Sequence, residues 1–85
     1  MLDLCHGPGW GLEAVVRRFP AARVTALDFT DTFRRTAQAR AEQAQDRNFR
    51  DGHPAVPIVW VGPDRWAGFG HPLPFARGVF DAVRL

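Results

Sequence analysis

Short apolar runs alternate along this chain with segments of helical periodicity, and this alternation constrains the fold more than any other feature. The runs cover Leu2 to Cys5, Val24 to Phe29, Ile58 to Val61 and Val79 to Leu85. Each is rich in aliphatic or β-branched residues, which is typical of buried strands. Strands that alternate with helices form parallel sheets, so the sequence predicts an α/β domain.

Two segments between these runs follow the helical period. The first ends at Pro20, which cannot continue a helix, and its apolar stripe comprises Leu12, Val15, Val16 and Phe19. The second is expected to begin after Thr30, whose hydroxyl can cap it, with Asp31 in its first turn. Its stripe comprises Phe33, Ala37, Ala41 and Ala44.

Glycine and proline predict irregular structure from Asp46 to Pro57 and from Gly62 to Gly78. In the second stretch we expect the aromatic side chains Trp66, Phe69 and Phe75 to fold back onto the sheet. Right-handed crossovers place both helices on one face of the sheet and give the strand order 3-2-1-4.

Composition and charge exclude several classes of protein. The chain has 85 residues, enough for one domain, and its 46% hydrophobic and 24% charged residues are typical of a soluble globular protein. A net charge of +2 with scattered arginines argues against a nucleic-acid partner. A single cysteine excludes an internal disulfide, and the three histidines are too dispersed to indicate a metal site. No apolar run is long enough to predict a membrane span or a signal peptide. We therefore expect a cytoplasmic protein.

The stretch CHGPGWG follows the first strand at the point where the predicted strand order reverses, and open parallel sheets bind ligands there. Gly7 and Gly9 permit a tight turn and the close approach of a ligand. Asp28 follows Gly9 by nineteen residues and ends the second strand, where an acid accepts hydrogen bonds from ribose hydroxyls. Asp3 lies inside an apolar run, where a charge is costly, so it too is a candidate site residue.

Each of these features also has a purely structural interpretation. A Gly-Pro-Gly turn and an aspartate at a strand end are common, and only their combination favours a ligand site. Cys5 next to His6 could suggest a nucleophile, but neighbours on a strand point to opposite faces, so a buried, inert thiol is the preferred interpretation.

The spacing of the glycines bears on which nucleoside ligand binds. A dinucleotide site has the pattern G-x-G-x-x-G, whereas here the third glycine, Gly11, comes one residue early. Pro8 also lacks an amide donor for a pyrophosphate. A ligand with a ribose and no phosphate fits better, and a nicotinamide-dinucleotide module is the alternative.

The stretches LDLCHGPG, VTALDFT and PLPFARGVFDAV resemble class I S-adenosylmethionine-dependent methyltransferases, most closely the ubiquinone and menaquinone biosynthesis type. That family has a D-x-C-C-G-T-G or D-x-G-C-G-x-G loop, a second strand similar to LDFS, and an LPF-x-D-x-x-FD-x-V approach to its fourth strand. The resemblance implies a Rossmann-like sheet, the cofactor S-adenosylmethionine, and methyl transfer to a small-molecule acceptor that the sequence does not identify.

The resemblance also implies roles for single residues. Asp3 and the backbone of Cys5 to Gly9 would lie along the methionine part of the cofactor. Asp28 would hold the ribose hydroxyls, and Phe29 would pack on the adenine. Asp64, in Gly62-Pro63-Asp64, stands one residue from the place of the family acid near the adenine amino group. No catalytic residue is assigned.

The resemblance covers nearly all of the chain but only the N-terminal, cofactor-binding half of the seven-stranded family fold. We therefore expect a partial sheet with one face lacking its helices and with the fourth strand as an open edge, which favours self-association and marginal stability. A non-catalytic remnant of a methyltransferase is a further alternative.

Overall fold

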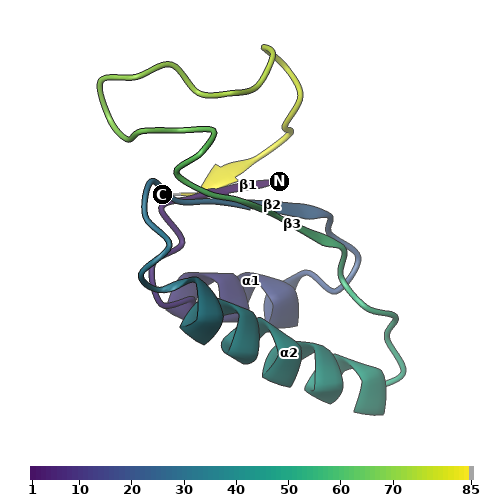
Figure 1. Cartoon of the computed structure of the whole chain (residues 1–85). Coiled ribbons are helices and arrows are strands. Elements are labelled where there is room, and N and C mark those ends of the chain that lie inside the picture. Colours follow the sequence, from purple (N-terminus) through teal and green to yellow (C-terminus); the bar gives the residue numbers. More distant parts are fainter. Residues whose placement is uncertain (85) are drawn as a thin grey trace.

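The computed structural model describes residues 1–84, which form a four-stranded sheet with both helices on one face (Figure 1). The helices are α1 (Trp10–Arg18) and α2 (Arg34–Arg50). The strands are β1 (Leu2–Leu4), β2 (Val24–Leu27), β3 (Ile58–Val61) and β4 (Val83–Arg84). All pairings are parallel and the order is β3-β2-β1-β4, which confirms the predicted α/β topology.

The register of the strands aligns their carboxyl ends along one edge of the sheet. Strand β1 pairs with β2 on one side and with β4 on the other. Asp3 in β1 lies opposite Ala26 in β2 and opposite Arg84 in β4. The two charged residues are therefore neighbours in the sheet, and β1 is the interior strand next to the reversal of strand order.

Aliphatic and alanine side chains form the core between the sheet and the helices, which we call the helix-covered face. Alanines on α2 allow that helix to lie close to α1 and to the strands, and α1 contributes larger side chains. The buried members are Leu12, Val15, Val16, Val24, Ala26, Ala41, Ala44 and Val56.

The opposite face of the sheet is covered by residues 62–82, which we call the covering segment (Figure 1). Trp66 from this segment is 3% exposed and packs with Leu2, Leu27 and Val61. Phe75 is half-buried against the same cluster. This face has no helix among the described residues, as expected, and the irregular covering segment packs on it instead.

The three aromatic residues expected to fold onto the sheet behave differently. Trp66 and Phe75 do so, and the Trp66 indole Nε1 donates to the carbonyl oxygen of His71 at 3.3 Å. Phe69, by contrast, is 65% exposed and packs edge-on against Trp66 with a centroid distance of 5.5 Å. It lies on the outside of the covering segment rather than on the sheet.

The second helix begins and ends later than the sequence predicts. Thr30 Oγ1 accepts from the Thr32 amide at 3.2 Å, so it closes a turn instead of capping the helix. At the other end, residues 46–50 are helical although a loop was expected from Asp46. Asn48 explains this extension, because its Nδ2 donates to the Val16 carbonyl oxygen at 2.9 Å and holds the last turns of α2 on α1.

The fourth strand is shorter than the expected range of 79 to 85. Only Val83 and Arg84 pair with β1, and the predicted end at Leu85 lies outside the described residues. Gly78, with φ 74°, and the contact between Phe75 and Phe80 keep the preceding residues in the covering segment. Within residues 1–84, no helix combines the length and the apolar character that a membrane crossing requires.

Candidate functional site

Residues Cys5–Gly9, here called the glycine loop, follow β1 and lead into α1. Cys5, Gly7 and Gly9 have φ values of 58°, 53° and 94°, so the backbone turns through the left-handed region three times. Such a conformation costs a residue with a side chain about 1–2 kcal/mol, and Cys5 is the one that bears it. Its amide donates to the Leu27 carbonyl oxygen at 2.7 Å, which anchors the loop to the end of β2.

The two glycines predicted to admit a ligand have different surroundings. A Cβ at Gly7 would meet no atom within 4 Å, so that position is open to an approaching group. A Cβ at Gly9 would lie 2.7 Å from the Cα of Ala37 in α2. Gly9 is therefore required by helix packing, and only Gly7 offers the free approach that a ligand needs.

Asp28 at the end of β2 is bound directly to the glycine loop. The Gly7 amide donates to Asp28 Oδ2 at 3.0 Å, and the Asp28 side chain is almost fully buried. His6 Nδ1 lies 4.0 Å from the same oxygen and hydrogen-bonds to the Gly7 carbonyl oxygen at 2.7 Å. The predicted pair of loop glycine and acid thus forms one unit at the carboxyl ends of β1 and β2.

The side chain of His6 has a packing role that the sequence did not indicate. It is buried, and its ring meets that of Trp60 edge-on at a centroid distance of 5.3 Å. Cys5 is half-buried beside the cluster around Trp66, and burial raises the pKa of its thiol. A raised pKa keeps the thiol protonated, in agreement with the inert interpretation.

Asp3 and Arg84 form an ion pair between the two strands that flank the reversal of strand order. Arg84 Nη1 donates to Asp3 Oδ1 at 3.1 Å. Asp3 is fully buried, and burial raises the pKa of its carboxyl although the Arg84 guanidinium beside it acts in the opposite direction. Its second oxygen, Oδ2, has no hydrogen-bond partner among the described residues. Arg84 is a candidate site residue that the sequence reasoning missed.

Phe29 and Asp64 lie on the covering-segment side of these strand ends. Phe29 is 44% exposed and packs edge-on against Trp66 and Phe69, with centroid distances of 5.9 and 6.5 Å. Asp64 is exposed and lies beside Gly62, where a Cβ would be 3.4 Å from its Oδ1 and 2.9 Å from Asp31 Oδ1. No hydrogen bond between described residues joins Asp64 to Phe29.

Arg40 of α2 fixes the glycine loop from the helix side. Its Nε donates to the Pro8 carbonyl oxygen at 3.0 Å, and its guanidinium lies 3.3 Å from the centroid of the exposed Trp10 ring. A hydrogen bond and a cation–π contact from one side chain hold both the loop and the first residue of α1. Nothing in the sequence spacing links residues 32 positions apart, so this anchor could not be foreseen.

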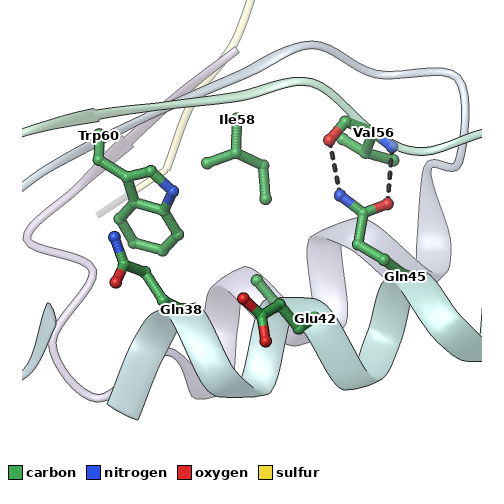
Figure 2. Close-up of a pocket in the computed structure, with 7 residues that line it drawn as sticks. Gln38, Glu42, Gln45, Val56, Ile58 and Trp60 are labelled. Carbon is green, nitrogen blue, oxygen red and sulfur yellow. Dashed lines mark hydrogen bonds between the residues drawn. The ribbon is translucent and has the colours of Figure 1, made fainter. Parts of the chain in front are cut away.

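Two hollows lie away from the glycine loop. The first, of about 370 Å³, opens between α2 and β3, where the Gln45 side chain bonds both backbone groups of Val56 at 2.6 and 2.7 Å (Figure 2). The second, of about 690 Å³, lies at the amino ends of the strands and includes Met1 and Phe19. Neither is lined by Asp28 or by a residue of the glycine loop.

Across residues 1–84, the structure brings together no group of three or more His, Cys, Asp or Glu side chains that could hold a metal ion. The sequence matches no protein-family model and no curated protein. The resemblance to methyltransferases therefore stays a prediction, and the geometry of the strand ends is the evidence on which a function can be argued.

Proposed function

We propose that this chain is the cofactor-binding part of an S-adenosylmethionine-dependent methyltransferase that acts on a small-molecule acceptor. The observation that carries the proposal is the 3.0 Å hydrogen bond from the Gly7 amide to Asp28 Oδ2. It joins the glycine loop to the acid at the end of β2, beside the reversal of strand order, where parallel sheets bind nucleosides.

The amides of the glycine loop favour a nucleoside without a pyrophosphate. The Gly7 amide is occupied by Asp28, and the Gly9 amide donates to the His6 carbonyl oxygen at 3.1 Å. Pro8 has no amide hydrogen. Residues 7–9 therefore offer a pyrophosphate no free donor, which argues against the nicotinamide-dinucleotide alternative.

The residues present fit the other parts of S-adenosylmethionine. Asp28 would accept hydrogen bonds from the ribose hydroxyls, and the exposed ring of Phe29, the next residue, would contact the adenine. The unpartnered Oδ2 of Asp3 suits the ammonium of the methionine end. A role for Asp64 near the adenine amino group rests on the family resemblance alone.

The chemistry of methyl transfer asks little acid–base catalysis of such a site. When bound, S-adenosylmethionine supplies a methyl group already activated by its sulfonium. The residues of this chain would bind and orient the cofactor, so their contribution to the rate is positioning of the donor relative to the acceptor.

The direct test is isothermal titration of the chain with S-adenosylhomocysteine and with NADH, after size-exclusion chromatography at two concentrations to define the species measured. We expect binding of S-adenosylhomocysteine and none of NADH. Tighter binding of NADH, or no binding of S-adenosylhomocysteine, would contradict the proposal.

The role of Asp28 is tested by Asp28→Asn, with titrations of adenosine and 2′-deoxyadenosine. In the unaltered chain we expect adenosine to bind roughly tenfold more tightly, because a hydroxyl bonded to a charged acceptor contributes about 1.5 kcal/mol or more. The substitution should remove this preference. Asp46→Asn, at an exposed position of α2, is the control and should keep it. An equal loss for both nucleosides would show that Asp28 acts only by holding the loop.

A further inference from the structure

Arg84 occupies an unusual place for a positively charged side chain. Its guanidinium fills the space that a side chain at Gly11 would take, in the first turn of α1. The amino end of a helix carries a partial positive charge, so a cation there is disfavoured unless an anion lies close by. Asp3 is the anion that the structure shows.

The first turn of α1 also has amide donors that no side chain of the described part of the chain caps. Gly9 is its N-cap residue and provides no side-chain acceptor, and the first amides of a helix have no partner within the helix. These amides and the guanidinium of Arg84 are gathered at one point and all attract a negative group.

Asp3 has a buried oxygen at the same place. One of its oxygens binds Arg84, while Oδ2 is fully buried and has no partner within residues 1–84, which is costly for a carboxylate. A ligand cation would relieve that cost. The place thus combines one carboxylate oxygen without a partner and helix amides without a side-chain cap, on either side of the Asp3–Arg84 pair. An α-amino acid group carries a charge of each sign on one carbon and can meet both.

From this geometry we infer that Arg84 binds the carboxylate of the α-amino acid end of the cofactor, in exchange for its bond to Asp3. Without ligand, Arg84 pairs with Asp3. With ligand, the ammonium takes over the Asp3 carboxylate, and the guanidinium turns toward the ligand carboxylate beside the first amides of α1. This inference rests on the proposed function and adds that the site selects ligands with a free carboxylate.

Two features of the structure allow this exchange. The side chain of Arg84 is 41% exposed, so its guanidinium can move without leaving a cavity in the core. Asp3 stays in place because it belongs to β1, which is paired with a strand on each side. A dianionic phosphate would suit the pair less well, because Asp3 cancels much of the positive charge that Arg84 provides.

The test compares S-adenosylmethionine, its decarboxylated form and 5′-methylthioadenosine, which carry the whole amino acid group, only its amine, and neither. Binding is measured by isothermal titration with the full chain. We expect the unaltered protein to bind S-adenosylmethionine roughly tenfold to a hundredfold more tightly than the decarboxylated form, the range for hydrogen bonds between charged groups. Arg84→Gln should abolish this difference and leave the affinity for 5′-methylthioadenosine unchanged.

Removal of Arg84 alone leaves the buried Asp3 charge without its partner, which can unfold the chain. The double variant Asp3→Asn with Arg84→Gln avoids that charge, and Arg84→Lys keeps the charge but loses the planar pair of donors. Arg77→Gln changes an exposed arginine of the covering segment and is the matched control. The lysine variant should retain part of the preference, the double variant none, and the control all of it.

The outcomes separate the inference from the proposed function. If the unaltered chain binds all three compounds equally, or if Arg84→Gln weakens all three by the same factor, the role of Arg84 is wrong and the cofactor site stands. If the unaltered chain binds none of them, the proposed function is overturned and this inference with it.

Discussion

The helix-covered face of the sheet and the face under the covering segment are held by different kinds of side chain. On the first, regularly spaced aliphatic and alanine residues from two helices pack against the strands. On the second, one indole, that of Trp66, closes a small cluster and is supported by half-buried aromatic rings of the covering segment. An irregular segment can therefore bury the middle of a sheet face without helices, but it leaves the outer strands of that face open, since Val59 and Val83 are 59% and 62% exposed.

Because of this difference, we expect a substitution of Trp66 to lower the free energy of unfolding the most. Trp66→Ala should cost about 3–5 kcal/mol, because the indole is fully packed and no helix can close the space. Leu12→Ala, on the helix-covered face, should cost about 2–5 kcal/mol. Urea unfolding followed by circular dichroism measures both values.

Amide hydrogen exchange in the same variants reports on the two faces separately. With Trp66→Ala we expect the amides of Arg65 and His71, which are bonded within the covering segment, to exchange faster while those of α1 and α2 stay protected. Leu12→Ala should lower protection in the helices as well. Equal loss of protection on both faces after Trp66→Ala would show that the two faces unfold as one unit.

A smaller effect is expected at Asn48, which joins the ends of the two helices. Its Oδ1 accepts from Arg17 Nη1 at 2.8 Å, and its Nδ2 binds the Val16 carbonyl oxygen. Asn48→Ala leaves that carbonyl without its partner and should cost about 1–3 kcal/mol. The thermal unfolding midpoint of Asn48→Asp should lie between those of the unaltered chain and Asn48→Ala, because the aspartate keeps an acceptor for Arg17. Gln43→Ala, exposed on the same helix, is the control and should leave the midpoint unchanged.

The smallest effect concerns Asp3, the residue of β1 that faces the helices, since Leu2 and Leu4 face the covering segment. Burial raises the pKa of Asp3 above its ordinary value of 3.8. Between that value and the raised folded pKa, the folded chain holds a proton that the unfolded chain has released. Stability from this group is therefore complete below pH 3.8 and is lost as the pH rises through the folded pKa.

Unfolding free energies of the unaltered chain and of Asp3→Asn, measured by urea across the acidic pH range, check this sign. The unfolding free energy of the unaltered chain should fall relative to that of Asp3→Asn as the pH rises above 3.8. Asp46→Asn controls for the loss of one negative charge. A relative unfolding free energy that rises with pH would mean that the ion pair with Arg84 affects the pKa of Asp3 more than burial does.

The sequence predicted the arrangement of the strands better than the limits of the elements. Strand order follows from the handedness of crossovers, which depends on element type and not on exact ends. The limits of α2 depend on contacts at a distance, such as the bond between Asn48 and Val16, which local composition does not encode. Thr30 shows the same point, because its hydroxyl can cap a helix or close a turn and the chain uses the second option.

In the candidate site, the sequence singled out two residues that the structure brings into contact. The bond between Gly7 and Asp28 joins two positions singled out by their place at strand ends. Arg84 was missed although the sequence held a signal for it. Arg84 is a charged residue in an apolar strand, and so is Asp3, with which it pairs in register. The different surroundings of Gly7 and Gly9 depend on where α2 lies, and no spacing in the sequence reveals that.

The ion pair between Asp3 and Arg84 also bears on the order in which the chain folds. These residues are 81 positions apart, whereas the contacts of Asn48 with α1 span 31 and 32 positions. Closing a longer loop costs more chain entropy, and contacts of long sequence separation slow folding. We expect the helical layer to assemble first and β4 to dock last. The proposed cofactor site at the carboxyl ends of β1 and β4 is then the final part of the molecule to form, so ligand binding there would report on the completion of folding.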